Sequence, residues 1–290
     1  MNPIPKVAAI HDLSGFGRSS LTVVIPILSA MGVQVCPLPT AVLSTHSGIS
    51  DYKFFDLTEG MRSFVEHWKT LDIKFNAIYS GFLGSSEQID IVKDMITSFN
   101  NKNQLIVIDP VLGDDGKLYG PFEVDMVDQM RSLISYADII TPNLTEAALL
   151  LNKTYHTDVT EKEVKEWAYE LSEKGPKTVI ITSVPDIKNR KITSVIAYNK
   201  SDKRYWKVSC DYLPAVYPGT GDAFTSVIVG ALLQGDSLPI ALDRAVDFVS
   251  MGVRSTFGYS EYNNMEGFLL EKVLGCLSSS AHRWSYELLE

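Results

Sequence analysis

The chain has 290 residues, of which 45% are hydrophobic and 21% charged, so it can bury a large core within one domain. Its formal net charge is -9, and no basic stripe is present that would neutralise a nucleic acid or an anionic membrane. No segment approaches the roughly 20 apolar residues that a membrane-spanning helix needs. We therefore expect neither nucleic acid nor a membrane among the partners.

Cysteine usage bears on the cellular compartment. Cys36, Cys210 and Cys276 form no CxxC pair and have no nearby histidine set at the spacing of a zinc site. The first nine residues lack the pattern of a secretory signal. The sequence thus predicts a cytoplasmic protein with reduced thiols.

Short β-branched runs alternate with stretches of helical period, the pattern of a parallel sheet covered by helices on both faces. The predicted strands span residues 6–11, 33–38, 77–81, 105–109, 138–141 and 178–182. The predicted helices span residues 86–99, 122–135, 161–174, 222–233 and 238–255. Residues 192–198 and 204–210 are predicted to form an antiparallel hairpin at the sheet edge. Since no repeat or linker interrupts this pattern, we expect a single domain over residues 1–290, with segments 45–59 and 113–121 left ambiguous.

The most informative local motif is Gly219-Thr220-Gly221-Asp222, which opens an apolar helix. Two glycines allow the backbone to turn, and amide groups at a helix N-terminus bind anions. Asp222 would lie beside a bound phosphate and accept the proton of an attacking hydroxyl group. We expect the nearby amides to keep it ionised and therefore a weak base. The alternative for this motif alone is that Thr220 and Asp222 merely cap a helix.

Polar side chains also follow three other predicted strands, where ligands of open parallel sheets bind. They are Asp109 and Asp114, Asn143 and Glu146, and Thr182 and Ser183. Carboxylates gathered there can hold Mg²⁺ and the phosphates that it bridges. Each segment alone could be an acidic turn or a helix cap. Together they predict an ATP–Mg²⁺ site, because the chain has no GxxxxGK[ST] motif and no complete dinucleotide-binding motif.

These motifs resemble the pyridoxal kinase branch of the ribokinase-like superfamily. The similarity covers most of the chain and includes SGFLGS at 80–85, DPVLGDDGKLYGP at 109–121, ADIITPNLTEA at 137–147, VIITS at 179–183 and PGTGDAF at 218–224. The resemblance implies an α/β fold of the ribokinase-like type, a three-layer sandwich whose mainly parallel central sheet has helices on both faces. It also implies that there is no separate lid domain and that the protein is a homodimer.

The resemblance further implies roles for single residues. Gly219, Thr220 and Gly221 would form an anion hole, with Asp222 as the catalytic base. The nucleotide phosphates and Mg²⁺ would be arranged by Asp109, Asp114, Asn143 and Glu146, with Asp109 and Glu146 nearest the metal, while Thr182 and Ser183 would contact ATP. Residues 114–119 would form a flexible cover over the nucleotide. A monovalent cation is a candidate second cofactor.

On the substrate side, the family's substrate-binding serine falls at Asp12 and its threonine at Ser47, next to His46. A carboxylate at Asp12 would favour a protonated ring nitrogen or a cationic amine. We therefore expect activity on pyridoxamine and pyridoxine as well as on pyridoxal. Phe82 stands where some relatives have a ring with a hydroxyl group. Of the two candidate histidine contacts, His11 and His46, the family match favours His46.

The expected reaction is ATP-dependent phosphorylation of the 5′-hydroxymethyl group of B6 vitamers. The alternative is a hydroxymethylpyrimidine kinase of thiamine synthesis, which shares the fold but typically has a cysteine after GTG, where this chain has Asp222. A non-catalytic vitamin or nucleotide sensor is the competing class, and the intact Asp222 and the acidic clusters disfavour it. A sugar kinase is disfavoured because no inserted β-lid is found in the N-terminal third.

Overall fold

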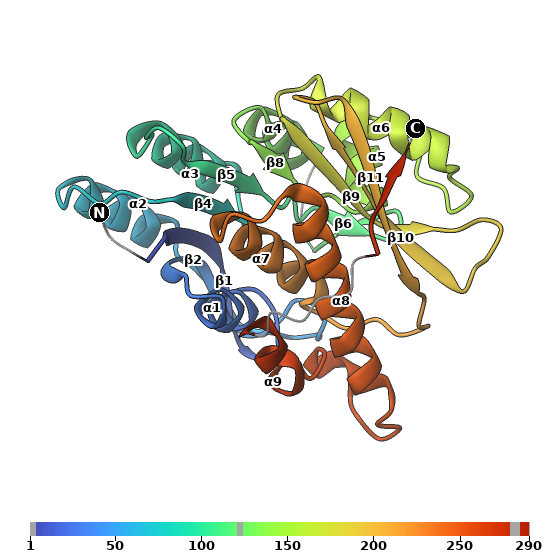
Figure 1. Ribbon diagram of the computed structural model, residues 1–290. Helices are drawn as coiled ribbons and strands as arrows, with labels where there is room; N and C mark the ends of the chain where they lie inside the picture. Colours follow the sequence, from blue (N-terminus) through green and yellow to red (C-terminus); the bar gives the residue numbers. More distant parts are fainter. Residues whose placement is uncertain (1–3, 121–123, 279–284, 290) are drawn as a thin grey trace.

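The computed structural model describes residues 4–120, 124–278 and 285–289 (Figure 1). Its central feature is a ten-stranded sheet in the order β12-β11-β10-β9-β8-β5-β4-β1-β2-β3. The strands are β1 (Lys6–Phe16), β2 (Gln34–Thr45), β3 (Phe54–Asp56), β4 (Ala77–Ser80), β5 (Leu105–Ile108), β8 (Ile139–Ile140), β9 (Thr178–Pro185), β10 (Ile192–Asn199), β11 (Arg204–Asp211) and β12 (Glu287–Leu289). A second sheet has two short strands, β6 (Gly113–Asp114) and β7 (Lys117–Leu118).

The strands between β2 and β9 pair in parallel, whereas both edges of the sheet are antiparallel. At one edge β3 pairs with β2, and at the other β10 and β11 form a hairpin that β12 extends. The predicted, mainly parallel sheet and its hairpin are confirmed. The expectation that the hairpin itself is the edge was wrong, since β12 pairs with β11 on the outer side.

Helices cover both faces of the sheet, as Figure 1 shows, which confirms the three-layer sandwich. Successive residues of β1 point to opposite faces: Ala8 and Ile10 pack in one core cluster, while Val7 and Ala9 pack in the other. The first cluster is covered by α2 (Thr58–Lys69), α3 (Ser86–Ser98), α4 (Val124–Ile134), α5 (Leu144–Leu151) and α6 (Glu161–Ser172). The second is covered by α1 (Leu21–Ala30), α7 (Thr220–Leu233), α8 (Leu238–Phe257) and α9 (Leu270–Val273).

Differences from the predicted elements have local causes. Helix α1 was missed because its sequence is apolar on most sides and contains Pro26, so it lacks a helical period. Strands β1 and β2 run further than predicted because they pair with each other as far as Phe16 and Thr45. The predicted helix 122–135 is α4, although residues 122 and 123 lie outside the described ranges. The ambiguous segment 45–59 contains β3 and the start of α2.

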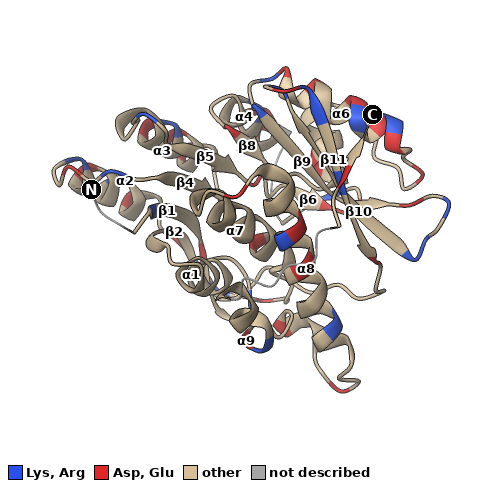
Figure 2. Ribbon diagram, in the orientation of Figure 1, with Lys and Arg blue, Asp and Glu red and all other residues tan. Residues whose placement is uncertain are grey.

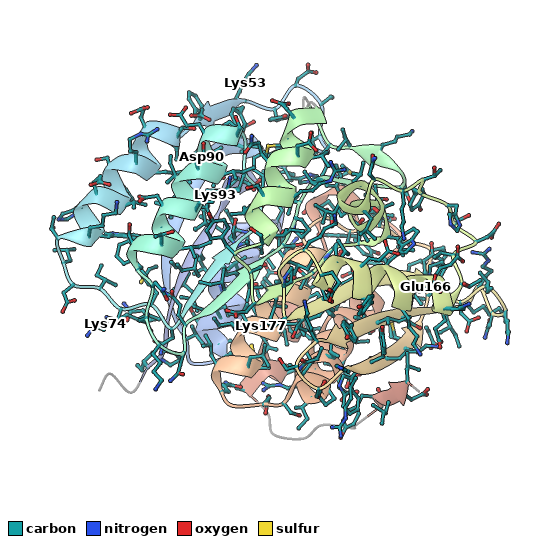
Figure 3. The ribbon with its side chains drawn as sticks, turned by 90° about the horizontal axis from the view of Figure 1, so that it is seen from above. Lys53, Lys74, Asp90, Lys93, Glu166 and Lys177 are labelled. Carbon is teal, nitrogen blue, oxygen red and sulfur yellow. The ribbon has the colours of Figure 1, made fainter. Side chains whose placement is uncertain are left out.

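Charged side chains of both signs are interspersed over the surface. Figure 2 shows Lys and Arg next to Asp and Glu along the helices and the antiparallel strands, in agreement with the expected lack of a basic stripe. Figure 3 shows Asp90 and Lys93 on the outward side of α3, where they form an ion pair of 3.4 Å. In the described part of the chain, no helix combines the length and apolarity that crossing a membrane requires.

Candidate active site

The carboxyl ends of the parallel strands bring distant polar residues to one edge of the sheet. Asp109 directly follows β5, and its backbone N–H donates to the carbonyl oxygen of Ser80 at the end of β4. Asn143 follows β8 and forms an isolated parallel bridge with Thr182 of β9. The strand order therefore places three of the predicted phosphate-binding segments side by side.

Gly219 fixes how the helix α7 begins. It is the N-cap residue, with φ of 82°, a conformation that favours glycine. A Cβ atom on Gly219 would lie 2.2 Å from the carbonyl oxygen of Arg18. Gly221, in contrast, is exposed and faces open space. Because the first amide groups of a helix have no acceptor within it, those of Thr220, Gly221 and Asp222 are available for an anion.

Asp222 lies in the first turn of α7, close to β1. Its Oδ2 accepts a hydrogen bond of 2.7 Å from the backbone N–H of Ser20. Burial raises the pKa of its carboxyl group to about 6, and the nearby Asp12 carboxylate adds to this increase. The side chain is therefore mainly ionised at neutral pH, as expected. Burial outweighs the backbone N–H of Ser20, which lowers the pKa, so Asp222 is a stronger base than an ordinary aspartate. With a pKa of about 6 it is still a weak base, as expected.

Asp12 is a buried carboxylate held by two serine hydroxyl groups. Its Oδ2 accepts from Ser14 Oγ at 3.0 Å, and its Oδ1 accepts from Ser20 Oγ. Burial raises the pKa of Asp12, while the two hydroxyl groups oppose that shift. Asp12 thus lies near Asp222, since Ser20 contacts both carboxylates, and its own hydrogen bonds come from uncharged donors.

His11, the candidate histidine that the family match did not favour, is a close neighbour of Asp222. It is fully buried, and its Nδ1 lies 3.7 Å from Asp222 Oδ1. Burial lowers its pKa to about 3, so the imidazole is neutral. Its ring stacks edge-on against Tyr79, with the ring centroids 4.4 Å apart. A neutral imidazole can orient a carboxylate, but it does not compete with Asp222 for the proton.

Glu146 and Asn143 form a capping box at the start of α5. Asn143 Oδ1 accepts from the N–H of Glu146, and Glu146 Oε2 accepts from the N–H of Asn143, both at 2.9 Å. Glu146 Oε1 also accepts from Leu112 N at 3.1 Å, and Asn143 Nδ2 donates to the Gly113 carbonyl at 2.8 Å. The capping interpretation is therefore correct for these residues. Their bonds to Leu112 and Gly113 also fix the segment after Asp109.

Asp109 and Glu146 are two neighbouring acidic side chains whose ionised forms are unfavourable. Both are almost fully buried, and burial raises the pKa of each carboxyl group. Asp222 raises the pKa of Asp109 further, and Asp109 does the same to Glu146. A divalent cation beside them would relieve this repulsion, so the carboxylate oxygens fit Mg²⁺.

Within the described ranges, no group of three or more His, Cys, Asp or Glu side chains could hold a metal ion by itself. The assignment of Asp109 and Glu146 to the metal stays a prediction.

Residues 114–119, the expected cover over the nucleotide, include a turn between β6 and β7. Asp114 is exposed and accepts from Asp115 N at 2.9 Å. The turn is attached to α5, because the N–H of Gly116 donates to Thr145 Oγ1 at 2.9 Å. The segment is thus a small hairpin whose tip is bonded to α5, and its role as a cover stays a prediction.

The end of β9 supplies the fourth polar segment. Thr182 N donates to the Pro142 carbonyl at 2.9 Å, which joins β9 to the segment before Asn143. Ser183 is exposed and has a positive φ of 58°, next to an irregularity in the pairing of β9 with β10. This local kink leaves Ser183 outside the core, as a contact with a nucleotide would require.

His46 and Ser47 lie in the turn that follows β2, but only Ser47 is exposed. Both ring nitrogens of His46 are engaged: Nδ1 accepts from Gly48 N at 3.2 Å, and Nε2 contacts the Met265 carbonyl at 2.5 Å. The first bond makes Nε2 the protonated nitrogen. His46 therefore joins two loops, and a ligand contact through its nitrogens would have to replace one of these bonds.

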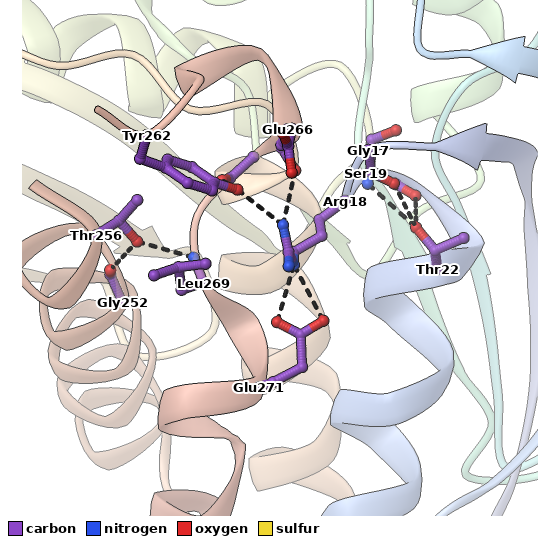
Figure 4. A network of polar contacts seen from close by, with 11 residues as sticks. Gly17, Arg18, Ser19, Thr22, Gly252, Thr256, Tyr262, Glu266, Leu269 and Glu271 are labelled. Carbon is purple, nitrogen blue, oxygen red and sulfur yellow. Dashed lines mark hydrogen bonds and ion pairs between the residues drawn. The ribbon is translucent and has the colours of Figure 1, made fainter. Parts of the chain in front are cut away.

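Sequence reasoning missed Ser20 and Arg18, which hold the loop opposite Gly219. Ser20 contacts both Asp12 and Asp222. Figure 4 shows the Arg18 guanidinium bound by Tyr262, Glu266 and Glu271. A serine before an apolar helix reads as an ordinary N-cap, so no local signal distinguished Ser20.

Comparisons with known proteins agree with this geometry. The family model described as phosphomethylpyrimidine kinase matches residues 28–265, and the chain belongs to that family. A Bacteroides thetaiotaomicron protein, provisionally assigned as a phosphomethylpyrimidine kinase and crystallised with pyridoxal, is 59% identical. It aligns over 99% of this chain and 100% of its own, with a TM-score of 0.96.

Two pyridoxal kinases are also similar. The structure from Lactobacillus plantarum is 31% identical, covering 94% of this chain and 96% of its own, with a TM-score of 0.84. The sequence from Arabidopsis thaliana is 29% identical over 246 residues, which cover 82% of this chain and 75% of the relative. The ribokinase-like kinase fold implied by the motifs is therefore confirmed.

Gly219 and Gly221 make a matched pair for testing the backbone requirement at the start of α7. We expect Gly219→Ala to lower the free energy of unfolding by at least about 2 kcal/mol, because it combines a clash with Arg18 and a strained φ. Gly221→Ala should leave that free energy unchanged or raise it by up to about 1 kcal/mol, since alanine favours the helix. Urea unfolding of both variants is the measurement, and equal destabilisation would contradict the role assigned to Gly219.

Proposed function

We propose that the protein transfers the terminal phosphoryl group of ATP to the 5′-hydroxymethyl group of B6 vitamers, giving the 5′-phosphate. The observation that carries this proposal is the partly buried Asp222 in the first turn of α7, just after the N-cap Gly219, where burial raises its pKa to about 6 and leaves it mainly ionised at neutral pH. Membership of the kinase family and the similarity to pyridoxal kinases agree with this reaction. A binding module that only senses a vitamin would not need a base with a raised pKa beside an anion site.

Each of these residues has a separate role in the proposed reaction. Amide groups of Thr220, Gly221 and Asp222 stabilise charge on the transferred phosphoryl group. Asp222 accepts the proton of the substrate hydroxyl group as its oxygen attacks phosphorus. Asp12 lies next to this carboxylate and contacts the ring or amine of the vitamer. Positioning supplies most of the rate, as is general for phosphoryl transfer.

The nucleotide side is assigned to the neighbouring strand ends. Asn143, Thr182 and Ser183 contact the nucleotide, and the hairpin that carries Asp114 covers it. Asp109 and Glu146 hold Mg²⁺ through their oxygens, and the bound ion neutralises the phosphate charge. A monovalent cation is a second candidate cofactor in this proposal.

The second candidate substrate is hydroxymethylpyrimidine, because the matching family model carries a phosphomethylpyrimidine kinase description. Its ring also bears a CH₂OH group, so Asp222 could act on it in the same way. The Bacteroides neighbour that was crystallised with pyridoxal favours the pyridine ring. Asp12 favours it too, since its carboxylate suits a protonated pyridine nitrogen or an amine.

Three further properties complete the proposal. We propose a single domain, because one sheet includes strands from residue 6 to residue 289. We propose a homodimer, which the motifs imply. A cytoplasmic location is supported by Cys36, Cys210 and Cys276, which form no disulfide in the described part of the chain.

Substrate choice is tested by ADP release from purified protein with pyridoxal, pyridoxine, pyridoxamine or hydroxymethylpyrimidine. We expect turnover of all three vitamers, with the pyrimidine poorer in kcat/KM. Asp12→Ser should lower kcat/KM for pyridoxamine about tenfold more than for pyridoxal, because a hydrogen bond between charged groups is lost. Equal effects on all three vitamers would remove Asp12 from substrate selection, and turnover of the pyrimidine alone would overturn the proposed function.

Asp222→Asn tests the base. It should lower kcat at least about a hundredfold, the scale of a positioned acid or base, and leave ATP affinity unchanged. In the unmodified protein kcat/KM should fall tenfold per pH unit below about pH 6, because Asp222 becomes protonated there. His11, with a pKa lowered to about 3, cannot cause that fall. Near-normal turnover of the variant would exclude Asp222 from proton transfer.

Glu146→Gln tests the metal assignment. The variant keeps the size of the side chain but loses the charge, so the Mg²⁺ concentration for half-maximal rate should rise about tenfold or more. Glu163→Gln is the matched control, since Glu163 closes the same kind of capping box on α6, with Thr160. Rates of both variants are measured against Mg²⁺ concentration. An unchanged Mg²⁺ dependence in Glu146→Gln would contradict its role.

A further inference from the structure

Ser20 has a backbone conformation that serine rarely adopts. Its φ is 53° and its ψ is -131°, a region that glycine favours and that costs other residues free energy. It is also the N-cap residue of α1, where a serine side chain normally accepts a hydrogen bond from the first turn. No such capping bond is present. The usual structural reason for a serine at this position is therefore missing.

The two donor groups of Ser20 point to the reacting centre instead. Its hydroxyl group donates to Asp12 Oδ1, and its backbone N–H donates to Asp222 Oδ2 at 2.7 Å. Ser20 is 8% exposed, so its hydroxyl bond to Asp12 is shielded from water, while its N–H bond to Asp222 is partly buried. One residue thus links the carboxylate assigned to the vitamer with the carboxylate assigned to proton transfer.

The surrounding loop is held by contacts that keep Ser20 in this conformation. The Arg18 carbonyl oxygen lies against Gly219, and the Arg18 N–H donates to the Glu266 carbonyl at 3.0 Å. The Arg18 guanidinium binds Glu271 at 2.9 Å and Tyr262 at 2.8 Å, as Figure 4 shows. Strained residues persist where neighbouring structure over-determines them, which is frequent at functional sites.

From this geometry we infer that Ser20 is a positioning residue for phosphoryl transfer, which holds Asp12 and Asp222 at a fixed separation through its hydroxyl and its N–H. This inference rests on the proposed function, in which Asp12 contacts the ring substrate and Asp222 takes its proton. The strained backbone directs the N–H towards Asp222, and the side chain is then free to hold Asp12 rather than cap α1. Ser20 itself does not touch the phosphoryl group.

Two substitutions separate this role from a purely structural one. Ser20→Ala removes the hydroxyl group and keeps the unfavourable φ, whereas Ser20→Gly removes the hydroxyl group and relieves the strain. The glycine variant should therefore unfold at the higher temperature of the two. Both should lower kcat/KM for pyridoxal about tenfold or more, because a buried charge loses a donor. The KM for ATP should stay within about twofold of the unmodified protein.

Ser19→Ala is the matched control. Ser19 is the preceding residue and is 7% exposed, and its hydroxyl oxygen has no hydrogen-bond partner in the described structure. Its replacement should change neither the unfolding temperature nor the kinetic constants appreciably. The control thus removes a buried serine hydroxyl from the same loop without touching Asp12 or Asp222.

The inference is overturned if both Ser20 variants keep kcat/KM within about twofold of the unmodified protein. It is also overturned if activity follows stability, so that Ser20→Gly is the more active of the two, or if the KM for ATP rises as much as that for pyridoxal. If Ser20→Ala does not fold, Ser20→Gly alone decides, because it lacks the strain.

Failure of the proposed function is a separate result. If the unmodified protein phosphorylates hydroxymethylpyrimidine and not the vitamers, the function fails, and the same variants are then measured on the pyrimidine. If the unmodified protein releases no ADP with any of these alcohols, both the function and the inference are wrong. Variant ratios on an active substrate therefore test Ser20 alone.

Discussion

The contact between the loop 17–20 and the start of α7 is the constraint on which the site depends. Gly219 approaches the Arg18 carbonyl so closely that no side chain fits between them. As a result, the backbone N–H of Ser20, in the loop, donates a hydrogen bond to the Asp222 carboxylate at the start of α7. Because backbone atoms set both sides of this contact, the main chain fixes the position of Asp222 relative to the loop 17–20.

A second feature of the site is a group of carboxylates that burial and mutual repulsion make costly. Asp12, Asp109, Asp222 and Glu146 all have a raised pKa, and burial is the largest cause for each. Among the described residues, none of them pairs with a lysine or arginine. Their neutral donors are serine and threonine hydroxyl groups and backbone amides. A cationic ligand would therefore bind more tightly, because it would relieve the repulsion between these carboxylates. At many active sites, groups that favour binding lower the stability of the protein in this way.

The sequence predicted the fold well where a simple period decides the structure. The buried strands and the helix predicted at residues 161–174 are examples, and so is the meeting of Asp109, Asn143 and Thr182 at one edge of the sheet. It did not predict α1, whose apolar sequence has no helical period. The inferred role of Ser20 could not be predicted from the sequence either, because it depends on a backbone angle and on residues far away in the chain. Patterns show which groups reach the edge of a sheet, but tertiary contacts decide which atoms face one another.

The bonds around Arg18 and Ser20 join parts of the chain that are synthesised far apart in time. Arg18 and Glu271 are separated by 253 positions, and Ser20 and Asp222 by 202. Contacts of such sequence separation form late, because a long loop has to close first. Until residue 271 has been synthesised, Arg18 therefore lacks its partner Glu271. The loop that carries Ser20 gains all of its contacts only when nearly the whole chain is present.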